Sequence, residues 1–463
     1  MEINEIIALS ADFIKLREKV ISTKTNTENI ANYLKQYDPY CHVITDKSKR
    51  PDKVVTTGEG AEQKTKVVSI SRLPIPMQKQ IVQFAAAFLC GNPIELIALP
   101  KDDTEKDMME VVKKSWMKNK LDYDSKKLVK IMMSETEVAE LWYREEADTD
   151  YWANTPNEGR PHRLRMKVLA NSLGDTLYPV FNAAGDMVAF ARAYTLLFDG
   201  KKEEHFDVYT DKTTWLAKSV NGQWEVVSEA NIFGKIPVIY YNQPKPEWND
   251  VQALIERWEE AISNHADTNG YFSSPMVKVS GEIKGFATKG ETGQVLELAN
   301  GATADYMSWD QSPKSLELEF KNLRSIIYDM TCTPDISIEN MKGLGTFSGI
   351  ALKMLFLSAH LKAADKEETF GKSIQRRINF IINAMGLFNV AKLGKATAID
   401  ITPKFVYYMP QNEEEIINLL VAATGGKAVM TQATAVKHNP LVNDKEAEIE
   451  ELKKEDTIDV LTP

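Results

Sequence analysis

The residues best spaced for chemistry form a glycine-rich string, G-L-G-T-F-S-G, which starts at Gly343. Closely spaced glycines let a backbone approach a phosphate group, as in dinucleotide-binding loops. That fingerprint requires a third glycine where Ser348 stands and a strand before the loop, whereas the pattern before this string is helical. The glycines therefore predict a flexible loop, and one interpretation of it is the lid of a nucleic-acid-processing enzyme.

The other candidate groups have simpler interpretations. The string G-K-S at Gly371 lacks the upstream glycine of a P-loop, because Lys366 stands there, and it lies inside a helical pattern. The adjacent carboxylates Glu259 and Glu260 point apart on a helix, which indicates a solvated face rather than an acid–base pair. None of the histidines has a second histidine four residues away, and the one cysteine beside a histidine, Cys41, has no further Cys or His near it. The histidines are His42, His162, His205, His265, His360 and His438. We expect no catalytic residue, no cofactor and no metal site.

Composition and charge are those of an ordinary globular chain. Of the 463 residues, 43% are apolar and 26% are charged, and the length predicts two to four sub-domains of roughly 150 residues each. The formal net charge of -10 argues against a protein that grips nucleic acid by neutralising phosphates. The cysteines Cys41, Cys90 and Cys332 are far apart, which indicates free thiols in a reducing compartment. We expect neither a signal peptide nor a membrane helix, because the apolar run at 350–361 is too short to span a bilayer.

Apolar spacing in the first half of the chain predicts helices followed by a sheet. Helical periods occur in the first forty residues and over residues 74–93, 103–119 and 125–140. Residues 45–66 are polar and lack an apolar period, which predicts an exposed loop or a locally disordered arm. Between residues 164 and 238 apolar residues tend to alternate, and turn residues occur at Gly185 and Asn221. This part predicts an antiparallel sheet.

The second half returns to helical patterns. Residues 250–270 and 314–331 predict two amphipathic helices, the first with an acidic polar face, and residues 273–313 between them combine short β-like strings with glycines. Pro334 opens the glycine-rich loop, since proline and the residue before it leave the helical conformation. A long helix is predicted from Gly349 to about residue 387, then a strand-like string at Lys404 and an acidic helical tail from residue 412. The pattern as a whole predicts an α+β fold.

The order of these pieces and several strings resemble the portal proteins of tailed bacteriophages, of the type typical of long-tailed phages that infect Gram-positive hosts. The resemblance covers most of the chain and depends on the order and spacing of the strings together. The strings are F-L-C-G-N-P-I at Phe88, L-Y-P-V-F-N-A-A-G-D-M-V-A-F-A-R-A-Y at Leu177, F-G-K-I-P-V-I at Phe233, E-R-W-E-E-A-I-S-N-H-A-D at Glu256, P-D-I-S-I-E-N-M at Pro334, F-S-G-I-A-L-K at Phe347 and N-P-L-V-N-D-K-E-A-E-I-E-E-L-K-K-E at Asn439.

This resemblance implies a division of the chain into the parts of a portal subunit. Residues 1–247 would form the N-terminal part of a wing of helices and antiparallel sheet. Residues 248–272 and 314–333 would be two stem helices, with a small β-rich clip at 273–313 between them. Residues 334–348 would be a tunnel loop, 349–410 a kinked long helix with the C-terminal part of the wing, and 411–463 a helical crown.

The resemblance also implies a function without catalysis. The chain would form a ring, usually of twelve subunits, at one capsid vertex of the virion, as the channel for packaging and ejecting double-stranded DNA. The implied partners are further copies of the chain, DNA bound without sequence preference, the terminase large subunit, a head-completion or adaptor protein, and the major capsid and scaffolding proteins. Assembly would take place in the host cytoplasm, without membrane contact.

Two sets of residues are expected to line that channel. The tunnel-loop set is Asn340, Met341, Lys342, Gly343, Leu344 and Gly345, and the stem set is Glu256, Glu259 and Glu260. Lys342 is the only cation between Arg324 and Lys353, so a ring of copies would place positive charge where it contacts phosphates without reading bases. The simpler alternative is that Lys342 is a solvated turn residue. The rival function, a nucleic-acid-processing enzyme, should show clustered Asp, Glu and His residues or a phosphate-binding loop, which the sequence lacks.

Overall fold

The computed structural model describes residues 12–24, 27–57, 63–220, 222–272, 277–281, 283–285, 297–298, 301, 303–306, 313–336, 354–407, 413–425, 428–442 and 444–459. The described helices are α2 (Phe13–Ser22), α3 (Thr27–Tyr37), α4 (Met77–Cys90), α5 (Asp103–Lys118), α6 (Leu121–Glu135), α7 (Gln252–Phe272), α8 (Pro313–Met330), α11 (Leu357–Phe388), α12 (Val390–Leu393), α13 (Glu413–Thr424), α14 (Gln432–His438) and α15 (Lys445–Asp459). The described strands are β1 (Lys53–Thr57), β2 (Lys64–Val68), β3 (Glu95–Ala98), β4 (Glu137–Glu146), β5 (His162–Leu169), β6 (Asp175–Phe181), β7 (Met187–Phe198), β8 (Lys201–Tyr209), β9 (Thr213–Val220), β10 (Gln223–Ala230), β11 (Val238–Asn242), β12 (Val277–Ser280), β13 (Ile283–Gly285), β14 (Glu297–Leu298), β15 (Thr303–Tyr306) and β16 (Ile401–Lys404).

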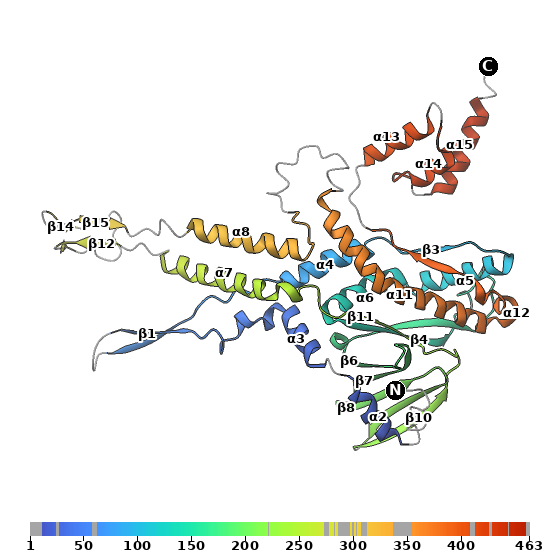
Figure 1. Ribbon diagram of the computed structural model, residues 1–463, viewed down its shortest axis with the longest axis horizontal. Coiled ribbons are helices and arrows are strands. Elements are labelled where there is room, and N and C mark those ends of the chain that lie inside the picture. The colour runs from blue at the N-terminus through green and yellow to red at the C-terminus, as the bar shows by residue number, and fades with distance from the viewer. Residues whose placement is uncertain are drawn as a thin grey trace.

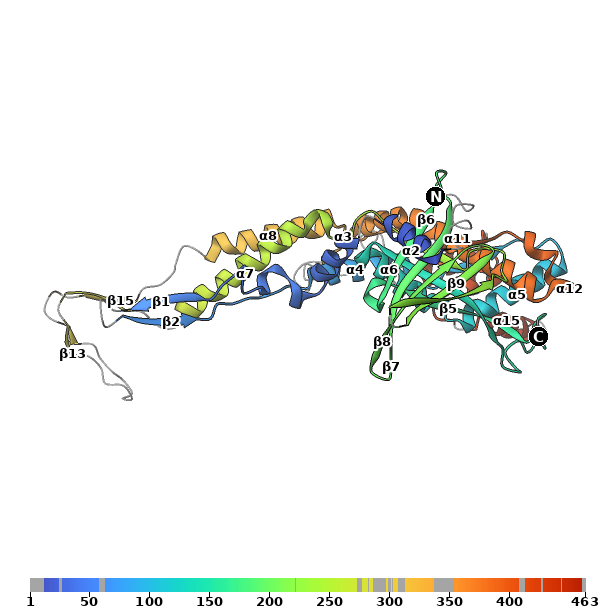
Figure 2. The same cartoon turned by 90° about the horizontal axis from the view of Figure 1, so that it is seen from below.

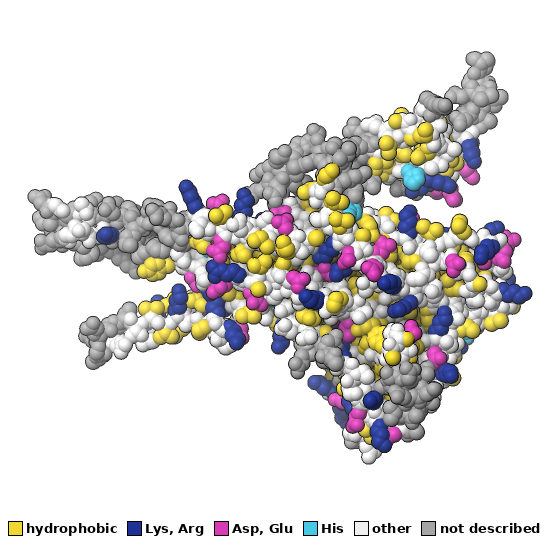
Figure 3. Space-filling view, viewed as in Figure 1, with side chains coloured by type: hydrophobic (Ala, Val, Ile, Leu, Met, Phe, Trp, Pro, Cys, Tyr) yellow, Lys and Arg dark blue, Asp and Glu magenta, His cyan; other side chains and the backbone are white. Residues whose placement is uncertain are grey.

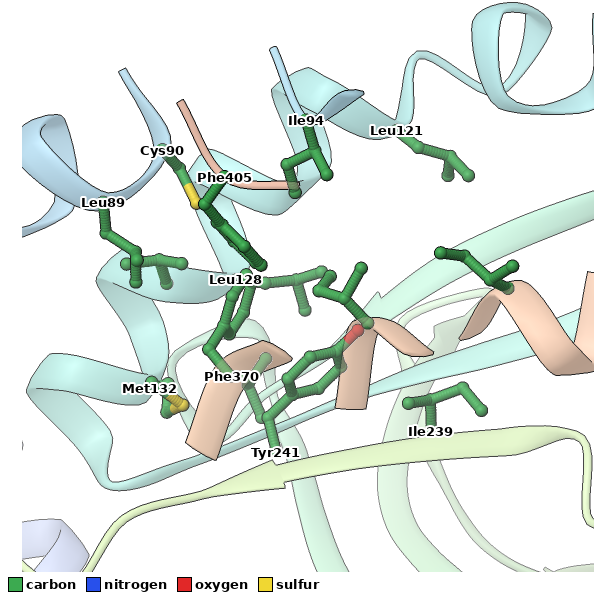
Figure 4. Packing of buried hydrophobic residues seen from close by; sticks show 14 of the residues in the cluster. Leu89, Cys90, Ile94, Leu121, Leu128, Met132, Ile239, Tyr241, Phe370 and Phe405 are labelled. Atoms are coloured by element: carbon green, nitrogen blue, oxygen red, sulfur yellow. The ribbon is translucent and has the colours of Figure 1, made fainter. Parts of the chain in front are cut away.

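The main core lies between helices and a three-stranded sheet with the order β11-β4-β5. Helix α11 passes through this core, and it buries Phe370, Ile374, Ile378 and Ile381 at helical spacing. The ring of Phe370 contacts Tyr241 of β11, with the ring centroids 5.1 Å apart. Figure 4 shows this contact among side chains that come from α4, α6 and α11. Because elements far apart in the sequence share this core, it joins the two halves of the chain.

A second sheet has five antiparallel strands in the order β10-β9-β8-β7-β6. Its hairpin turns use residues with positive φ, among them Gly185 (85°), the pair Asp199 (49°) and Gly200 (75°), and Gly222 (81°). Helix α2 covers one face of the sheet with Phe13, Leu16 and Val20. The antiparallel pairing predicted for residues 164–238 is therefore confirmed, although the strands form two sheets.

The body of the molecule carries three projections (Figure 1). Helices α7 and α8 form a long two-helix arm, and the strands β12 and β15 pair at its far end. The β1–β2 hairpin extends in the same direction beside that arm (Figure 2). Helices α13, α14 and α15 follow α11 and β16 as a separate group. The helices predicted at 250–270 and 314–331 are thus present, and no helix in the described part of the chain has an apolar stretch long enough to span a membrane.

Three local predictions were wrong. Residues 45–66 contain β1 and the start of β2, which pair as antiparallel strands. The pairing places the β-branched side chains of Val54 and Val67 opposite each other, where they stabilise the ribbon. Helix α6 ends at Glu135 and not at 140, because Thr136 adopts the left-handed conformation (φ 68°). The strand predicted to begin at Lys404 instead ends there, and the apolar Phe405 that follows packs in the core against Phe370.

Candidate channel stem

The two helices of the arm are held together by one ion pair and by ring packing. The Arg257 guanidinium of α7 donates to the Glu319 carboxylate of α8 through Nη2 at 2.8 Å and Nε at 3.0 Å. This carboxylate raises the pKa of Arg257 above its ordinary value. Further along α7, the His265 ring lies edge-on to Phe320 of α8, with ring centroids 5.9 Å apart. One face of α7 therefore packs against α8.

The three stem glutamates predicted to line a channel are not equivalent in the structure. Glu259 is buried, with only 1% of its surface exposed. Its Oε1 accepts a hydrogen bond from the Ile75 N–H at 2.7 Å and lies 2.6 Å from Nδ1 of His42. A side chain enclosed within its own subunit does not face a lumen. The prediction for Glu259 was wrong, because a carboxylate that looks solvated in the helical pattern is covered by residues far away in the sequence.

Glu256 and Glu260 retain access to solvent. The Glu260 side chain is 51% exposed and lies 3.2 Å from Nη1 of Arg257. Glu256 is half-buried and accepts a hydrogen bond from Nε2 of Gln252 at 2.9 Å. Both residues line a shallow pocket of about 390 Å³ with Lys49. Of the predicted stem set, these two remain candidates for contact with a lumen.

A short segment of residues 71–75, here called the strap, lies along α7. Three of its backbone N–H groups donate to side chains of the helix: Ser71 to Asp267 (2.6 Å), Leu73 to Ser263 (3.0 Å) and Ile75 to Glu259 (2.7 Å). The acceptors are four residues apart, about 6 Å along a helix, and the donors are two residues apart, about 6.6 Å along an extended chain. The two spacings match, so a single face of α7 carries a ladder of acceptors for the strap.

Two arginines fix the base of the hairpin to this ladder. Arg50 donates to Asn264 at 2.9 Å and to Asp267 at 3.2 Å. Arg72 donates to Asp52 at 2.8 Å and to the carbonyl oxygen of Arg50 at 2.6 Å. Burial alone would raise the pKa of Asp267, but the Ser71 N–H and the Arg50 guanidinium lower it below its ordinary value. This arrangement was not predicted, although the spacing of polar residues at 259, 263 and 267 could have indicated it.

The start of α11 is tied to the base of the two-helix arm. Lys362 and Lys366 of α11 both pair with Glu247, at 2.8 Å and 2.7 Å. Lys362 also donates to the carbonyl oxygen of Thr331, directly after α8, at 2.9 Å. The end of α8 and the first turns of α11 therefore lie beside each other. The predicted tunnel-loop residues Asn340, Met341, Lys342, Gly343, Leu344 and Gly345 lie outside the described residues and stay a prediction.

The described histidines take part in packing and hydrogen bonds. His42 lies between Glu259 and the carbonyl oxygen of Gln36, and His205 stacks on Tyr194 with ring centroids 4.8 Å apart. Within the described ranges, no group of three or more His, Cys, Asp or Glu side chains is arranged to hold a metal ion.

Comparison with known proteins identifies the class to which this arrangement belongs. Residues 20–459 match the model of the family of phage portal proteins described as SPP1 Gp6-like. The chain therefore belongs to the SPP1 Gp6-like family of phage portal proteins, which confirms the resemblance seen in the sequence. Members of this family are structural components of the virion, so the interpretation as a nucleic-acid-processing enzyme was wrong.

Individual relatives are more distant. The chain is similar to the portal protein of Bacillus phage SPP1, with 23% identity over 279 residues, which is 55% of this chain and 54% of that protein. The match thus spans about half the length of this curated relative. Among solved structures, it is similar to a chain in the neck of an empty gene transfer agent (GTA) particle (TM-score 0.41, 11% identity, 76% of this chain and 87% of the other). It is also similar to one in the neck of a native GTA particle (TM-score 0.36, 12% identity, 78% and 89%).

Proposed function

We propose that twelve copies of this chain form a ring at one capsid vertex, through which the phage genome is packaged and later ejected. The observation that carries the proposal is the extent of the family match, because residues 20–459 include the body, the two-helix arm and the C-terminal helices. In this assignment α7 and α8 are the stem, residues 273–313 the clip, 334–348 the tunnel loop and 411–463 the crown. Residues 1–247 and 349–410 form the wing.

The charges on the arm suit a conduit in which DNA must slide. Lysines and arginines that neutralise phosphates give salt-dependent grip, and each added contact tightens it. On α7 the exposed Arg257 is already paired with Glu319 and Glu260. Its charge is therefore compensated within the subunit, and Glu256 adds negative charge on the same helix. Such a surface of α7 repels a DNA backbone weakly.

The partners follow from the same assignment. The clip, at the far end of the arm, docks the terminase large subunit during packaging and the head-completion or adaptor protein afterwards. The wing contacts the major capsid and scaffolding proteins during assembly in the host cytoplasm. Recognition of DNA is independent of sequence, because a moving duplex presents its phosphates and not a fixed set of bases.

The stem part of the proposal is tested by reversing charge on α7. The double variant Glu256→Lys, Glu260→Lys should assemble rings but package less DNA, because the added cations hold phosphates in the channel. The matched control is Glu446→Lys, Glu450→Lys, which makes the same charge change at exposed positions of α15. Packaged DNA length and particle yield are measured for both. Normal packaging by the α7 variant would contradict the placement of this helix along the channel.

The loop part is tested at Lys342. If the loop meets DNA, Lys342→Glu and the stiffened variant Gly343→Ala, Gly345→Ala should fold and assemble but impair packaging or retention of DNA. Lys395→Glu, at an exposed position after α12, provides the control for loss of one cation. Packaging at the control's level in both loop variants would leave Lys342 as a solvated turn residue.

A further inference from the structure

The His42 ring is buried where helix α3, the strap and helix α7 meet. Only 3% of its side chain is exposed. Its Nδ1 lies 2.6 Å from Oε1 of Glu259 on α7, and its Nε2 lies 2.8 Å from the carbonyl oxygen of Gln36, near the end of α3. The same Oε1 of Glu259 accepts the hydrogen bond from the Ile75 N–H of the strap. Both ring nitrogens of His42 therefore face oxygen atoms.

These two oxygen atoms determine how many protons the site holds. A backbone carbonyl oxygen carries no hydrogen, so Nε2 of His42 donates to Gln36. In a neutral imidazole the other nitrogen then has a lone pair, which would face the lone pairs of the Glu259 carboxylate across 2.6 Å. A hydrogen between Nδ1 and Oε1 replaces this repulsion with a charge-assisted hydrogen bond. The pair therefore holds one proton more than a neutral imidazole and a carboxylate hold separately.

The groups around the ring are held in place. The Gln36 side chain accepts a hydrogen bond from Nε1 of Trp248 at 3.0 Å, and Trp248 is fully buried. Gln36 also belongs to the last turn of α3, where the backbone dipoles of a helix place partial negative charge and favour a cation. Of the residues that the structure describes, only Glu259 forms an ion pair with His42.

The charges on the α7 side nearly cancel. The charged residues that border the same shallow pocket as Glu259 are Lys49, Arg50, Glu256, Arg257 and Glu260. Arg50 and Arg257 are already paired with carboxylates. On the face that Figure 3 shows, acidic and basic side chains are interspersed over the two-helix arm. Glu259 therefore remains the counter-charge of the His42 ring.

The other titratable groups near this junction keep their charge around neutral pH. On the α3, α4 and strap sides they are Lys35, Tyr37, Asp38, Cys41, Arg72 and Lys79. Lysine, arginine, tyrosine and aspartate side chains do not ordinarily titrate between pH 6 and about pH 8.5. Desolvation raises the pKa of the Cys41 thiol above its ordinary value. His42 is the group at this junction whose charge changes in that range.

We propose that the proton shared by His42 and Glu259 makes the contact between the strap and α7 a pH-sensitive switch. While the proton is present, Glu259 binds both the His42 ring and the Ile75 N–H, and the strap lies on the helix. When the proton leaves to solvent, the buried carboxylate loses its counter-charge, and opening of the strap lets water solvate it. The strap follows β2 directly, so the switch controls how firmly the base of the hairpin is held beside the arm.

The direction of the pH dependence follows from the protons bound in each state. An imidazole exposed to water binds a proton only below about pH 6.5. Above that pH, opening of the strap releases the proton, so opening becomes easier as the pH rises, by up to about tenfold per pH unit for one proton. All of these groups lie within one chain, so the switch does not depend on the proposed ring.

Hydrogen exchange of residues 71–75 between pH 6 and pH 8.5 tests the switch. The rates are expressed as protection factors, relative to the exchange rate of an unstructured chain at the same pH, which removes the intrinsic effect of pH on exchange. The protection factor of the strap in the unaltered chain should fall by about tenfold or more over this range, as release of one proton requires.

Two variants remove the shared proton and keep a polar side chain in its place. In His42→Gln and in Glu259→Gln the protection factor of the strap should not vary with pH, and if one of them does not fold, the other provides the same test. His438→Gln, at an exposed position of α14, is the control and should keep the pH dependence of the unaltered chain. Constant protection of the strap in the unaltered chain, or an equal fall in either folded variant, would overturn the switch.

Discussion

Arg377 and Glu140 form an ion pair in the centre of the body, where both side chains are fully buried. Glu140 also accepts hydrogen bonds from Trp142 Nε1 at 3.0 Å and from the Tyr241 hydroxyl at 2.7 Å, and Arg377 donates to Ser125 Oγ at 2.8 Å. Burial alone would lower the pKa of Arg377, but the Glu140 carboxylate raises it above its ordinary value. The pair connects α11 to β4, two elements more than two hundred residues apart in the sequence.

The first prediction removes the cation of this pair. Arg377→Met leaves the Glu140 carboxylate buried without its partner and should lower the free energy of unfolding by about 3–5 kcal/mol. Arg376→Met is the matched control, because Arg376 is the preceding residue of α11 and is exposed. Urea unfolding of both variants measures the difference. Equal stability of the two variants would show that the pair contributes little to the fold.

Glu247 gives a prediction about pH. Burial alone would raise its pKa, but Lys362 and Lys366 lower it below the ordinary value of 4.5. A carboxylate whose pKa is lower in the folded state contributes stability that is fully present above about pH 4.5, and this stability is lost as the pH falls through the folded-state pKa. The stability difference between the unaltered chain and Glu247→Gln should therefore be largest near pH 7 and shrink on acidification.

Urea unfolding between pH 7 and pH 3 measures this difference. Asp250→Asn provides the control, because Asp250 is exposed and pairs across the surface with Lys245, where solvent screens the interaction. A difference for Glu247→Gln that stays constant over this range would contradict the assigned pairing.

At the scale of elements, apolar periodicity predicted the helices that depend on residues close together in the sequence. Helices α4 and α5 were predicted because their apolar residues recur at helical spacing. The β1–β2 hairpin was missed because Lys, Thr and Gly around a few valines have the composition of a loop. The strap was missed because its donors and acceptors are 184 to 196 residues apart. For the same reason Glu259 was misplaced, since nothing in its own helix indicates that His42 and Ile75 cover it.

The strap yields a prediction at this scale. Glu259→Leu leaves the Ile75 N–H and the His42 ring without their acceptor, at a cost of about 1–3 kcal/mol for each buried group. Hydrogen exchange at residues 71–75 should become roughly tenfold faster or more, because the segment opens more often. Glu260→Leu, at the next and half-exposed position, should leave this exchange unchanged. Equal protection of the strap in both variants would contradict the ladder on α7.

At the scale of the whole molecule, stability is concentrated in the body. The large core joins α4, α6 and α11 to the sheet of β4, β5 and β11. Beyond residue 412, by contrast, the only described side chains that are buried are Leu420, Ala435 and Val436. The three C-terminal helices follow one another in space as in the sequence, with α14 contacting both α13 and α15. Few apolar contacts are available there to hold the last helix in place.

The last prediction follows from this distribution. A chain that ends at residue 443 loses α15 and a segment in which acidic residues outnumber basic ones. It should keep the unfolding temperature of the full chain within a few degrees and still assemble rings. A chain that ends at residue 400 is the contrasting control. It also loses β16 and Phe405, which pair with β3 and pack against Phe370, and it should fold poorly. Thermal unfolding and analytical ultracentrifugation distinguish the two. If the shorter deletion yields only unassembled or aggregated chain, the C-terminal segment takes part in assembly and is not an accessory crown.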